Sequence, residues 1–200
     1  RAGDATPPPA RAWPSLWLLP ALALVASAVL SAARIAALIR FYGAPLAVYS
    51  DLHAALGRLP PGGAPLLVCT GKEWYRYPSA FFLPHGARVA FVRDGFDGLL
   101  PSPFSAPPPA GSRALHAHFN DQNRDEPSAY VDEARCDILV DLELPADRSR
   151  AAAWHVWARR PFLDAARSPS WSRAFYLPKL SDSRNSYADY LVLARQPLPP

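Results

Sequence analysis

The longest apolar stretch of the chain lies near its N-terminus. Between Leu16 and Ala33 no residue carries a charge. Eighteen helical residues extend about 27 Å, close to the hydrocarbon thickness of a bilayer at about 30 Å. Trp13 and Trp17 stand where aromatic side chains mark a membrane interface, and Arg34 and Arg40 follow the other end. The pattern predicts a transmembrane helix.

Two other interpretations fit the same segment. The small residues between 26 and 33 resemble the cleavage region of a signal peptide, and an apolar helix can also form the core of a soluble domain. A signal peptide begins near an initiator Met and lacks a polar, Pro-rich leader such as residues 1–11. We therefore favour the membrane span. The chain has no Met, and we expect it to be a fragment or a processed form.

Behind this helix polar and apolar residues mix and turn signals recur, which indicates a soluble domain. Ser50 or Asp51 is suited to cap a short amphipathic helix that ends at Pro60, and a second short helix is predicted from Pro127 to Arg135. Strands alternating with short helices predict an α/β domain with a mixed sheet. The predicted strands are Leu66 to Cys69, Arg88 to Val92, Asp137 to Glu143 and Tyr190 to Ala194.

Composition divides the chain into four regions. Residues 1–12 are a Pro-rich loop or tail, 13–40 the membrane helix with its flank, 41–195 the α/β domain and 196–200 a Pro-rich tail. Half of the 200 residues are hydrophobic and 12% are aromatic, which excludes a disordered chain. The formal charge of +4 is scattered without a basic run, so we expect no nucleic-acid partner.

The densest group of polar side chains lies between Leu115 and Pro127. So many donors and acceptors suit a hydroxyl-rich ligand such as a glycan. The same residue types also build turns, in which Asn and Asp bond nearby backbone and Glu126 caps the following helix. Both interpretations stay open. The candidate substrate-binding residues are His118, Asn120, Asp121, Asn123 and Glu126.

Several other chemistries lack their signatures. His116 and His118 fall on one face of an extended segment, but neither HExxH nor CxxC spacing accompanies them, so we predict no metal site. Gly71 and Lys72 follow a predicted strand without the upstream Gly or the Ser or Thr of a phosphate loop. No Gly-x-Ser-x-Gly indicates a Ser hydrolase.

The chain has two cysteines, Cys69 and Cys136. In an oxidising compartment they allow one disulfide. Two buried free thiols are the alternative, because Cys is among the most buried residue types.

Five segments together resemble the C-terminal region of the dolichyl-phosphate-mannose-dependent α-1,2-mannosyltransferases of the lipid-linked oligosaccharide pathway, in glycosyltransferase family 22. They occur in the same order and cover most of the chain beyond Trp13, which makes the resemblance more specific than any single short motif. The matching segments are 33–49 (ARIAALIRFYGAPLAVY), 68–84 (VCTGKEWYRYPSAFFLP), 118–143 (HFNDQNRDEPSAYVDEARCDILVDLE), 159–168 (RRPFLDAARS) and 173–182 (RAFYLPKLSD).

The resemblance implies a multi-helix membrane enzyme of the GT-C type in the endoplasmic reticulum. Such an enzyme transfers mannose from dolichyl-phosphate-mannose to a lipid-linked oligosaccharide for protein N-glycosylation, without a further cofactor. The family's acidic catalytic residues lie in its first lumenal loop, so the catalytic residues are expected outside this chain. The family implies a lumenal domain, whereas Arg34 and Arg40 favour a cytoplasmic one by the positive-inside rule. Because earlier helices usually set topology, we follow the family.

Two alternatives are kept. One is a single-pass, membrane-anchored glycan-binding module without an enzymatic part in the same chain. The other is a sister mannosyltransferase of glycolipid-anchor synthesis, which shares the architecture of the family.

Overall fold

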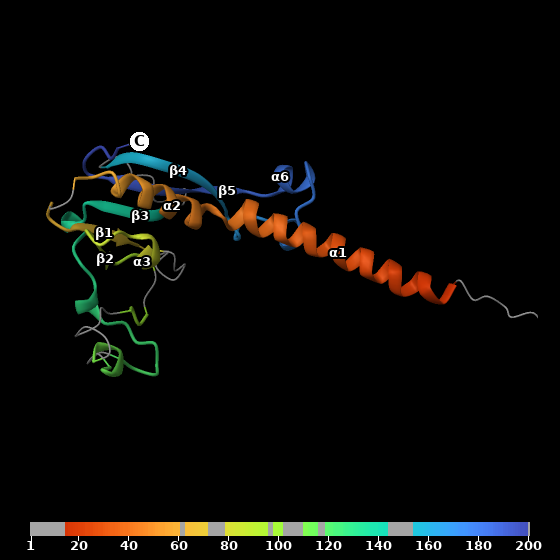
Figure 1. Cartoon of the computed structure of the whole chain (residues 1–200), viewed down its shortest axis with the longest axis horizontal. Coiled ribbons are helices and arrows are strands. Elements are labelled where there is room, and N and C mark those ends of the chain that lie inside the picture. Colours follow the sequence, from red (N-terminus) through yellow and green to blue (C-terminus); the bar gives the residue numbers. More distant parts are fainter. Residues whose placement is uncertain are drawn as a thin grey trace, which may run out of the picture.

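A computed structural model describes residues 15–60, 63–71, 79–95, 98–101, 110–115, 119–143 and 154–199. Within these ranges one long helix leads into a domain built on a five-stranded sheet (Figure 1). The helices are α1 (Ser15–Tyr42), α2 (Ala44–Leu56), α3 (Ser79–Phe82), α5 (Ser170–Ala174) and α6 (Leu180–Arg184). The strands are β1 (Leu66–Thr70), β2 (Ala87–Phe91), β3 (Ile138–Glu143), β4 (His155–Leu163) and β5 (Tyr187–Ala194).

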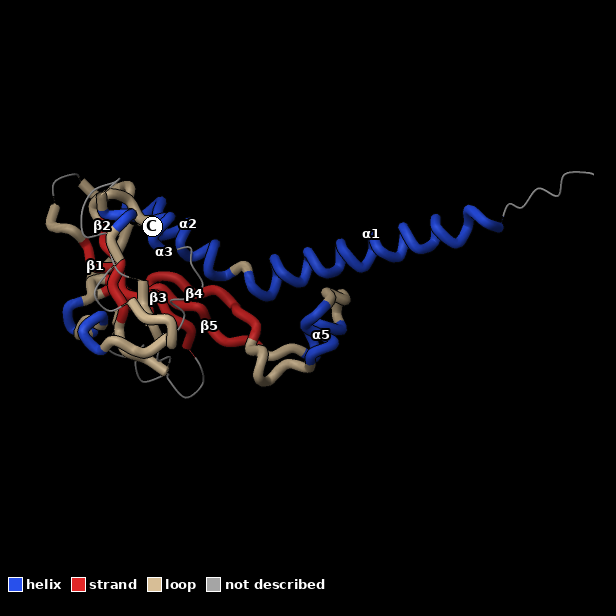
Figure 2. The backbone as a smooth tube through the Cα atoms, turned by 90° about the horizontal axis from the view of Figure 1, so that it is seen from below, coloured by secondary structure: helices blue, strands red, loops and turns tan. Residues whose placement is uncertain are grey.

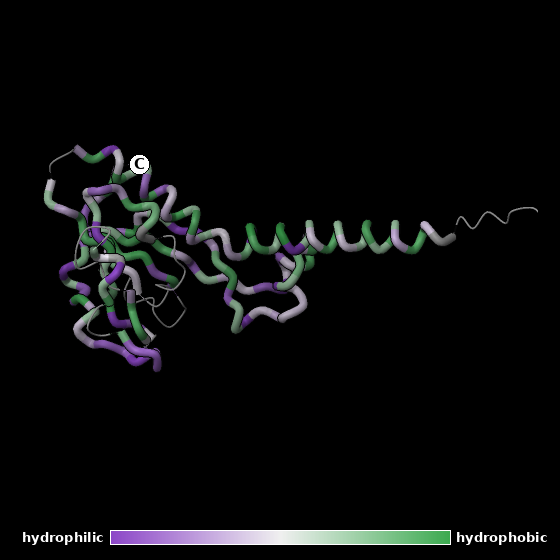
Figure 3. The backbone as a smooth tube through the Cα atoms, turned by 60° about the horizontal axis from the view of Figure 1, so that its bottom comes forward, coloured by the Kyte–Doolittle hydropathy of each residue, from purple (hydrophilic) through white to green (hydrophobic). Residues whose placement is uncertain are grey.

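Helix α1 is long and apolar enough to cross a membrane, by its length and composition. Its large side chains are exposed along most of its length, for example Trp17 at 80% and Leu24 at 72%. In Figure 3 many residues along the part of α1 that extends away from the domain carry the colour of hydrophobic residues. Near the C-terminal end Ala37 and Phe41 are fully buried. An apolar helix that contacts its own domain only at one end needs another apolar environment for the rest.

A single residue, Gly43, separates α1 from α2. A Cβ at Gly43 would stand 2.4 Å from the Ile39 carbonyl oxygen, so only glycine fits this junction. Pro45, in the first turn of α2, suits a helix start because its missing amide has no partner to lose there. Because α2 begins at Ala44, Ser50 and Asp51 both lie inside it. The prediction that one of them caps the helix was wrong.

The sheet is mixed, with the strand order β2-β1-β3-β5-β4. Strand β1 pairs in parallel with β2 and β3, while β5 pairs antiparallel with β3 and β4. The predicted fold class, an apolar helix followed by an α/β domain with a mixed sheet, is confirmed, and each predicted strand is present with small shifts at its ends. Strand β4 was not predicted, because Arg159, Arg160 and Pro161 interrupt its apolar pattern. As an edge strand β4 tolerates a proline.

Helix α2 covers one face of the sheet. Its buried Val48, Tyr49 and Leu52 pack in one cluster with Val140 and Tyr190 of the central strands. On the opposite face a second cluster includes Leu139, Leu191 and Leu193, so β3 and β5 are buried on both faces, as their nearly continuous apolar sequences require.

Cys69 of β1 and Cys136, just before β3, form a disulfide within the second cluster. Their Cα atoms are 5.8 Å apart. The bond joins two segments that are 67 residues apart in the sequence, at the point where β1 and β3 run side by side.

The helix predicted from Pro127 to Arg135 is not present. The segment instead forms two single 3-10 turns, η3 (Pro127–Ala129) and η4 (Glu133–Arg135). Between them Tyr130 bridges to Phe91, and the Val131 amide donates to the Phe91 carbonyl at 2.8 Å. This pairing beside β2 requires extended backbone, which interrupts the helix.

The disulfide is expected to be a main source of stability for the domain. Replacing both residues, Cys69→Ala with Cys136→Ala, should lower the free energy of unfolding by about 4 kcal/mol, because the bond restricts a long loop of the unfolded chain. Denaturant titration measures the loss, and reduction of the unmodified protein is the matched control. Peptide mapping without reductant should recover one linked pair, and two freely alkylated thiols would contradict the bridge.

Candidate functional site

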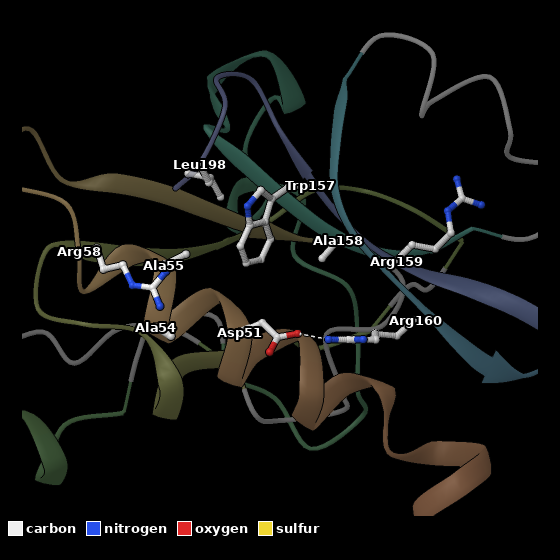
Figure 4. Close-up of a pocket in the computed structure, with 9 residues that line it drawn as sticks. All are labelled: Asp51, Ala54, Ala55, Arg58, Trp157, Ala158, Arg159, Arg160 and Leu198. Atoms are coloured by element: carbon white, nitrogen blue, oxygen red, sulfur yellow. Dashed lines mark hydrogen bonds and ion pairs between the residues drawn. The ribbon is translucent and has the colours of Figure 1, made fainter. Parts of the chain in front are cut away.

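An open groove lies between α2 and the edge strand β4 (Figure 4). Its volume is about 610 Å³. Helix α2 supplies alanines and one acidic residue, the turn after it supplies an arginine, and β4 supplies an aromatic residue and two arginines. The C-terminal segment lines one side. The lining residues are Asp51, Ala54, Ala55, Arg58, Trp157, Ala158, Arg159, Arg160 and Leu198.

A β-bulge places Trp157 in the groove. The pairing of β4 with β5 passes from Val156 opposite Leu193 to Ala158 opposite Val192, so Trp157 is the extra residue of β4. Its ring is half-buried against the core cluster below α2 and presents a face to the groove (Figure 4). A fixed, partly exposed indole face offers the apolar platform on which the C–H face of a sugar ring can stack.

Charged side chains stand at both ends of this platform. The Arg160 guanidinium donates to the Asp51 carboxylate at 2.6 Å, which joins β4 to α2 across one end. Arg58 extends from the end of α2 at the other, while Arg159 points away from the pair and bonds Asp189 (Figure 4). The side chains of Arg160 and Asp51 remain 49% and 40% exposed, so their interaction adds little stability. The groove thus combines donors, an acceptor and an aromatic face.

The polar loop from Phe119 to Glu126 lies elsewhere. It continues from the β2 edge of the sheet, whereas the groove borders β4 at the opposite edge (Figure 1). The structure does not bring the two together.

Asn120 organises the loop through its side-chain amide. Its Oδ1 accepts from the backbone amides of Gln122 at 3.1 Å and Arg124 at 2.8 Å, and its Nδ2 donates to the Arg124 carbonyl at 3.2 Å. Asn123 has a positive φ of 51°, and its Oδ1 accepts from the Leu99 amide at 3.0 Å. Asn tolerates this backbone better than other residues with a side chain. Both side chains therefore have structural partners.

The remaining candidate residues differ in their surroundings. Glu126 Oε1 accepts from the amide and the hydroxyl of Ser128, so Glu126 caps the turn η3. Asp121 is exposed at the tip of the loop. His118 lies outside the described residues. Contact of any of the five with a substrate stays a prediction.

A buried polar group lies at the end of β1. The Tyr49 hydroxyl and Thr70 Oγ1 are 3.2 Å apart, and the Asp141 carboxylate, 4% exposed, accepts from the Leu142 amide. A Cβ at Gly71 would stand 2.7 Å from Asp141 Oδ2, so glycine makes room for this carboxylate. Among the described residues no group of three or more His, Cys, Asp or Glu is arranged to hold a metal ion.

The groove was not predicted from the sequence. Trp157, Arg58 and Asp51 belong to elements far apart in the chain, and only the packing of α2 on β4 brings them together. The one local signal was the Trp-Ala-Arg-Arg run from 157 to 160, in which an aromatic and two cations break the pattern of a buried strand.

Known proteins with related sequences cover most of this chain. It is 43% identical to the mouse α-1,2-mannosyltransferase ALG9 over 176 residues, which are 82% of the chain and 29% of that protein. It is 37% identical to the Arabidopsis thaliana ALG9 over 175 residues, 84% of the chain and 30% of the relative. The Saccharomyces cerevisiae ALG9 is also 37% identical, over 177 residues, 80% of the chain and 30% of the relative.

No family model and no solved structure matches the chain. The chain spans about 30% of the length of these relatives, in their C-terminal part. Identity at this level over such a long alignment establishes common ancestry for the shared part. Over that part, the chain is related to the C-terminal part of proteins named α-1,2-mannosyltransferase ALG9.

Proposed function

We propose that the chain is the C-terminal part of an α-1,2-mannosyltransferase of the endoplasmic reticulum membrane. The enzyme transfers mannose from dolichyl-phosphate-mannose to a lipid-linked oligosaccharide for protein N-glycosylation. Relatives named α-1,2-mannosyltransferase, 34 to 43% identical over most of the chain, support this activity. The exposed apolar surface of α1 supports a membrane span. The donor carries its own leaving group, so the reaction requires no further cofactor.

The domain faces the lumen in this proposal. The Cys69–Cys136 disulfide supports that side, because disulfides persist in the oxidising lumen and are rare in the cytosol. Arg34 and Arg40 would favour the cytoplasmic side, but both have partners in the domain, the Ala174 carbonyl and the Asp182 carboxylate. Both arginines therefore have a structural role, so their presence is weaker evidence for which side of the membrane the domain occupies.

The domain contributes binding, and the general base that removes the proton of the acceptor 2-hydroxyl lies outside this chain. The observation that carries the binding role is Trp157, held by a β-bulge with its face to the groove and with Arg58 and the Asp51–Arg160 pair at its ends. A mannose ring stacked on the indole would place its hydroxyls toward these donors and the acceptor. The groove is therefore proposed to hold a branch of the acceptor glycan.

Removing the indole tests this role in a full-length enzyme that carries the segment. Trp157→Ala should raise the KM for the lipid-linked acceptor about tenfold, equivalent to about 1.4 kcal/mol of lost binding. The kcat and the KM for dolichyl-phosphate-mannose should stay unchanged, because stacking on the indole is equal in ground and transition states. Steady-state kinetics with each substrate varied in turn provides the measurement.

Phe81→Ala is the matched control, since Phe81 is an 87% exposed aromatic residue of α3 that does not line the groove. It should leave both KM values unchanged. An unaltered acceptor KM in Trp157→Ala, with normal protein yield, would exclude the groove from acceptor binding while leaving the enzymatic assignment intact.

Two variants of the polar loop distinguish a structural role from a substrate-binding role. Asn120→Ala removes three hydrogen bonds within the loop and should lower the stability by about 1 to 3 kcal/mol, seen as a lower melting temperature. Asp121→Ala, at the exposed neighbour, should leave the melting temperature unchanged. Transfer activity per folded molecule is measured on the same preparations. A fall in that activity for Asp121→Ala would place the loop at the substrate, whereas unchanged activity in both variants would limit it to a structural role.

Lumenal placement is tested with an engineered glycosylation site. Arg113→Asn with Leu115→Thr creates an Asn-Ala-Thr acceptor at two exposed positions. In microsomes this variant should gain one N-glycan, seen as a gel shift that endoglycosidase reverses. Arg113→Gln with Leu115→Thr is the control without an acceptor. No shift, together with digestion of the domain by protease added outside sealed vesicles, would place the domain in the cytosol.

A further inference from the structure

Residues 164–186, which we term the arm, leave the sheet between β4 and β5 and carry α5 and α6. The neck of the arm is closed, because the Asp164 amide donates to the Ser186 carbonyl and the Ser186 amide to Ser168 Oγ, both at 2.9 Å. A side-chain hydrogen bond from Arg167 holds the pKa of the buried Asp164 carboxyl below its usual value. This carboxylate therefore stays ionised at neutral pH and keeps its bonds at the neck.

The interior of the arm is equally well bonded. Ser172 Oγ donates to Asn185 Oδ1 at 2.6 Å, and Ser181 Oγ accepts from the Leu177 amide at 2.9 Å and donates to the Phe175 carbonyl at 3.2 Å. Ser172 and Ser181 are fully buried. These hydrogen bonds give the arm a defined internal structure, and hence a defined surface.

The arm is fixed along the last turns of α1. The Tyr176 amide donates to the Ala33 carbonyl at 2.9 Å, and Arg34 donates to the Ala174 carbonyl at 2.8 Å. Nearly two turns further on, Arg40 pairs with Asp182 at 3.0 Å. Figure 2 shows the arm with α5 alongside α1, extended from the sheet in the direction in which α1 leaves the domain.

The surface that the arm leaves exposed is apolar and basic. Its large apolar side chains have exposed fractions of 36 to 52%: Trp171, Phe175, Leu177 and Leu180. Between residues 164 and 186 four side chains are basic and two are acidic, and both acidic ones already pair with arginines. Tryptophan, leucine and basic side chains on one small element are typical of segments that lie at the surface of a bilayer.

The position along α1 matches this chemistry. Ala33 ends the uncharged stretch of α1, and it follows Trp17 by a helical rise of about 24 Å. With Trp17 at one interface of a bilayer whose hydrocarbon region is about 30 Å thick, the arm meets α1 close to the other interface. The point at which the arm contacts α1 and the types of residue that the arm exposes are two independent indications of the membrane interface.

We propose that the arm is a membrane-interface anchor that lies in the headgroup region of the bilayer that α1 enters. Trp171 and Leu180 insert at the boundary with the acyl chains, and Lys179 and Arg184 contact lipid phosphates. The proposal rests on the membrane span of the proposed function. With α1 and the arm both held, the domain has two attachments to the membrane, which fix its tilt and hold the groove at a constant height above the lipid.

Fluorine NMR tests the position of the arm directly. The chain is labelled with 5-fluorotryptophan and reconstituted into phosphatidylcholine and phosphatidylserine nanodiscs, and Trp17→Phe, Trp157→Phe and Trp171→Phe assign three signals. The broadening of each signal is then measured in two samples, one with spin-labelled lipid and one with a gadolinium chelate in the water. Trp171 should broaden severalfold more with headgroup-labelled lipid than Trp157, which lies in the groove, while the chelate should broaden Trp157 more.

Trp17 serves as the internal reference for the span. If spin-labelled lipid broadens Trp17 but Trp171 responds only to the chelate, as Trp157 does, the arm is not at the interface and the proposal fails while the span holds. If Trp17 also responds only to the chelate, the span itself is wrong and the arm proposal falls with it. Protection of Trp171 from both reagents would mean that protein covers the arm, which also overturns the proposal.

Discussion

The junction at Gly43 is the constraint on which the rest of the structure depends. A Cβ at Gly43 would stand 2.4 Å from the Ile39 carbonyl oxygen in the last turn of α1, a distance that a residue with a side chain does not adopt. Because a single residue connects the two helices, the direction of α1 sets the direction of α2. Helix α2 carries the apolar residues that cover the sheet, so the orientation of the whole domain follows from the orientation of α1.

The arm adds a second constraint on the same helix. It contacts α1 from Ala33 to Arg40, whereas α2 continues from the end of α1 on the side of the sheet. A helix held at two points by one domain has little freedom to rotate about its axis. In the proposed function the acceptor is tethered to lipid, and a groove held at a fixed height would meet its glycan at a reproducible distance from the lipid anchor.

The two exposed polar regions differ in what occupies their side chains. In the loop after Phe119 the amides of Asn120 and Asn123 bond the backbone, so they build a shape and have less capacity for a ligand. In the groove the indole of Trp157 and the guanidinium of Arg58 face open space. A high density of polar residues in a sequence therefore does not by itself indicate a binding site. The direction in which the side chains point in the folded chain is more informative.

The sequence by itself determined the features that depend on local periodicity and composition. The apolar run of α1, the strands at the centre of the sheet and the mixed α/β class follow from patterns within single segments, which burial enforces directly. The tertiary structure decided what depends on contacts between distant segments. Strand β4 forms despite Pro161 because it has an edge position beside β5, and the turns around Tyr130 replace a helix because Phe91 offers a backbone partner. The groove exists only where α2 meets β4, since its charged pair joins Asp51 to a residue 109 positions away, a proximity that no local pattern encodes.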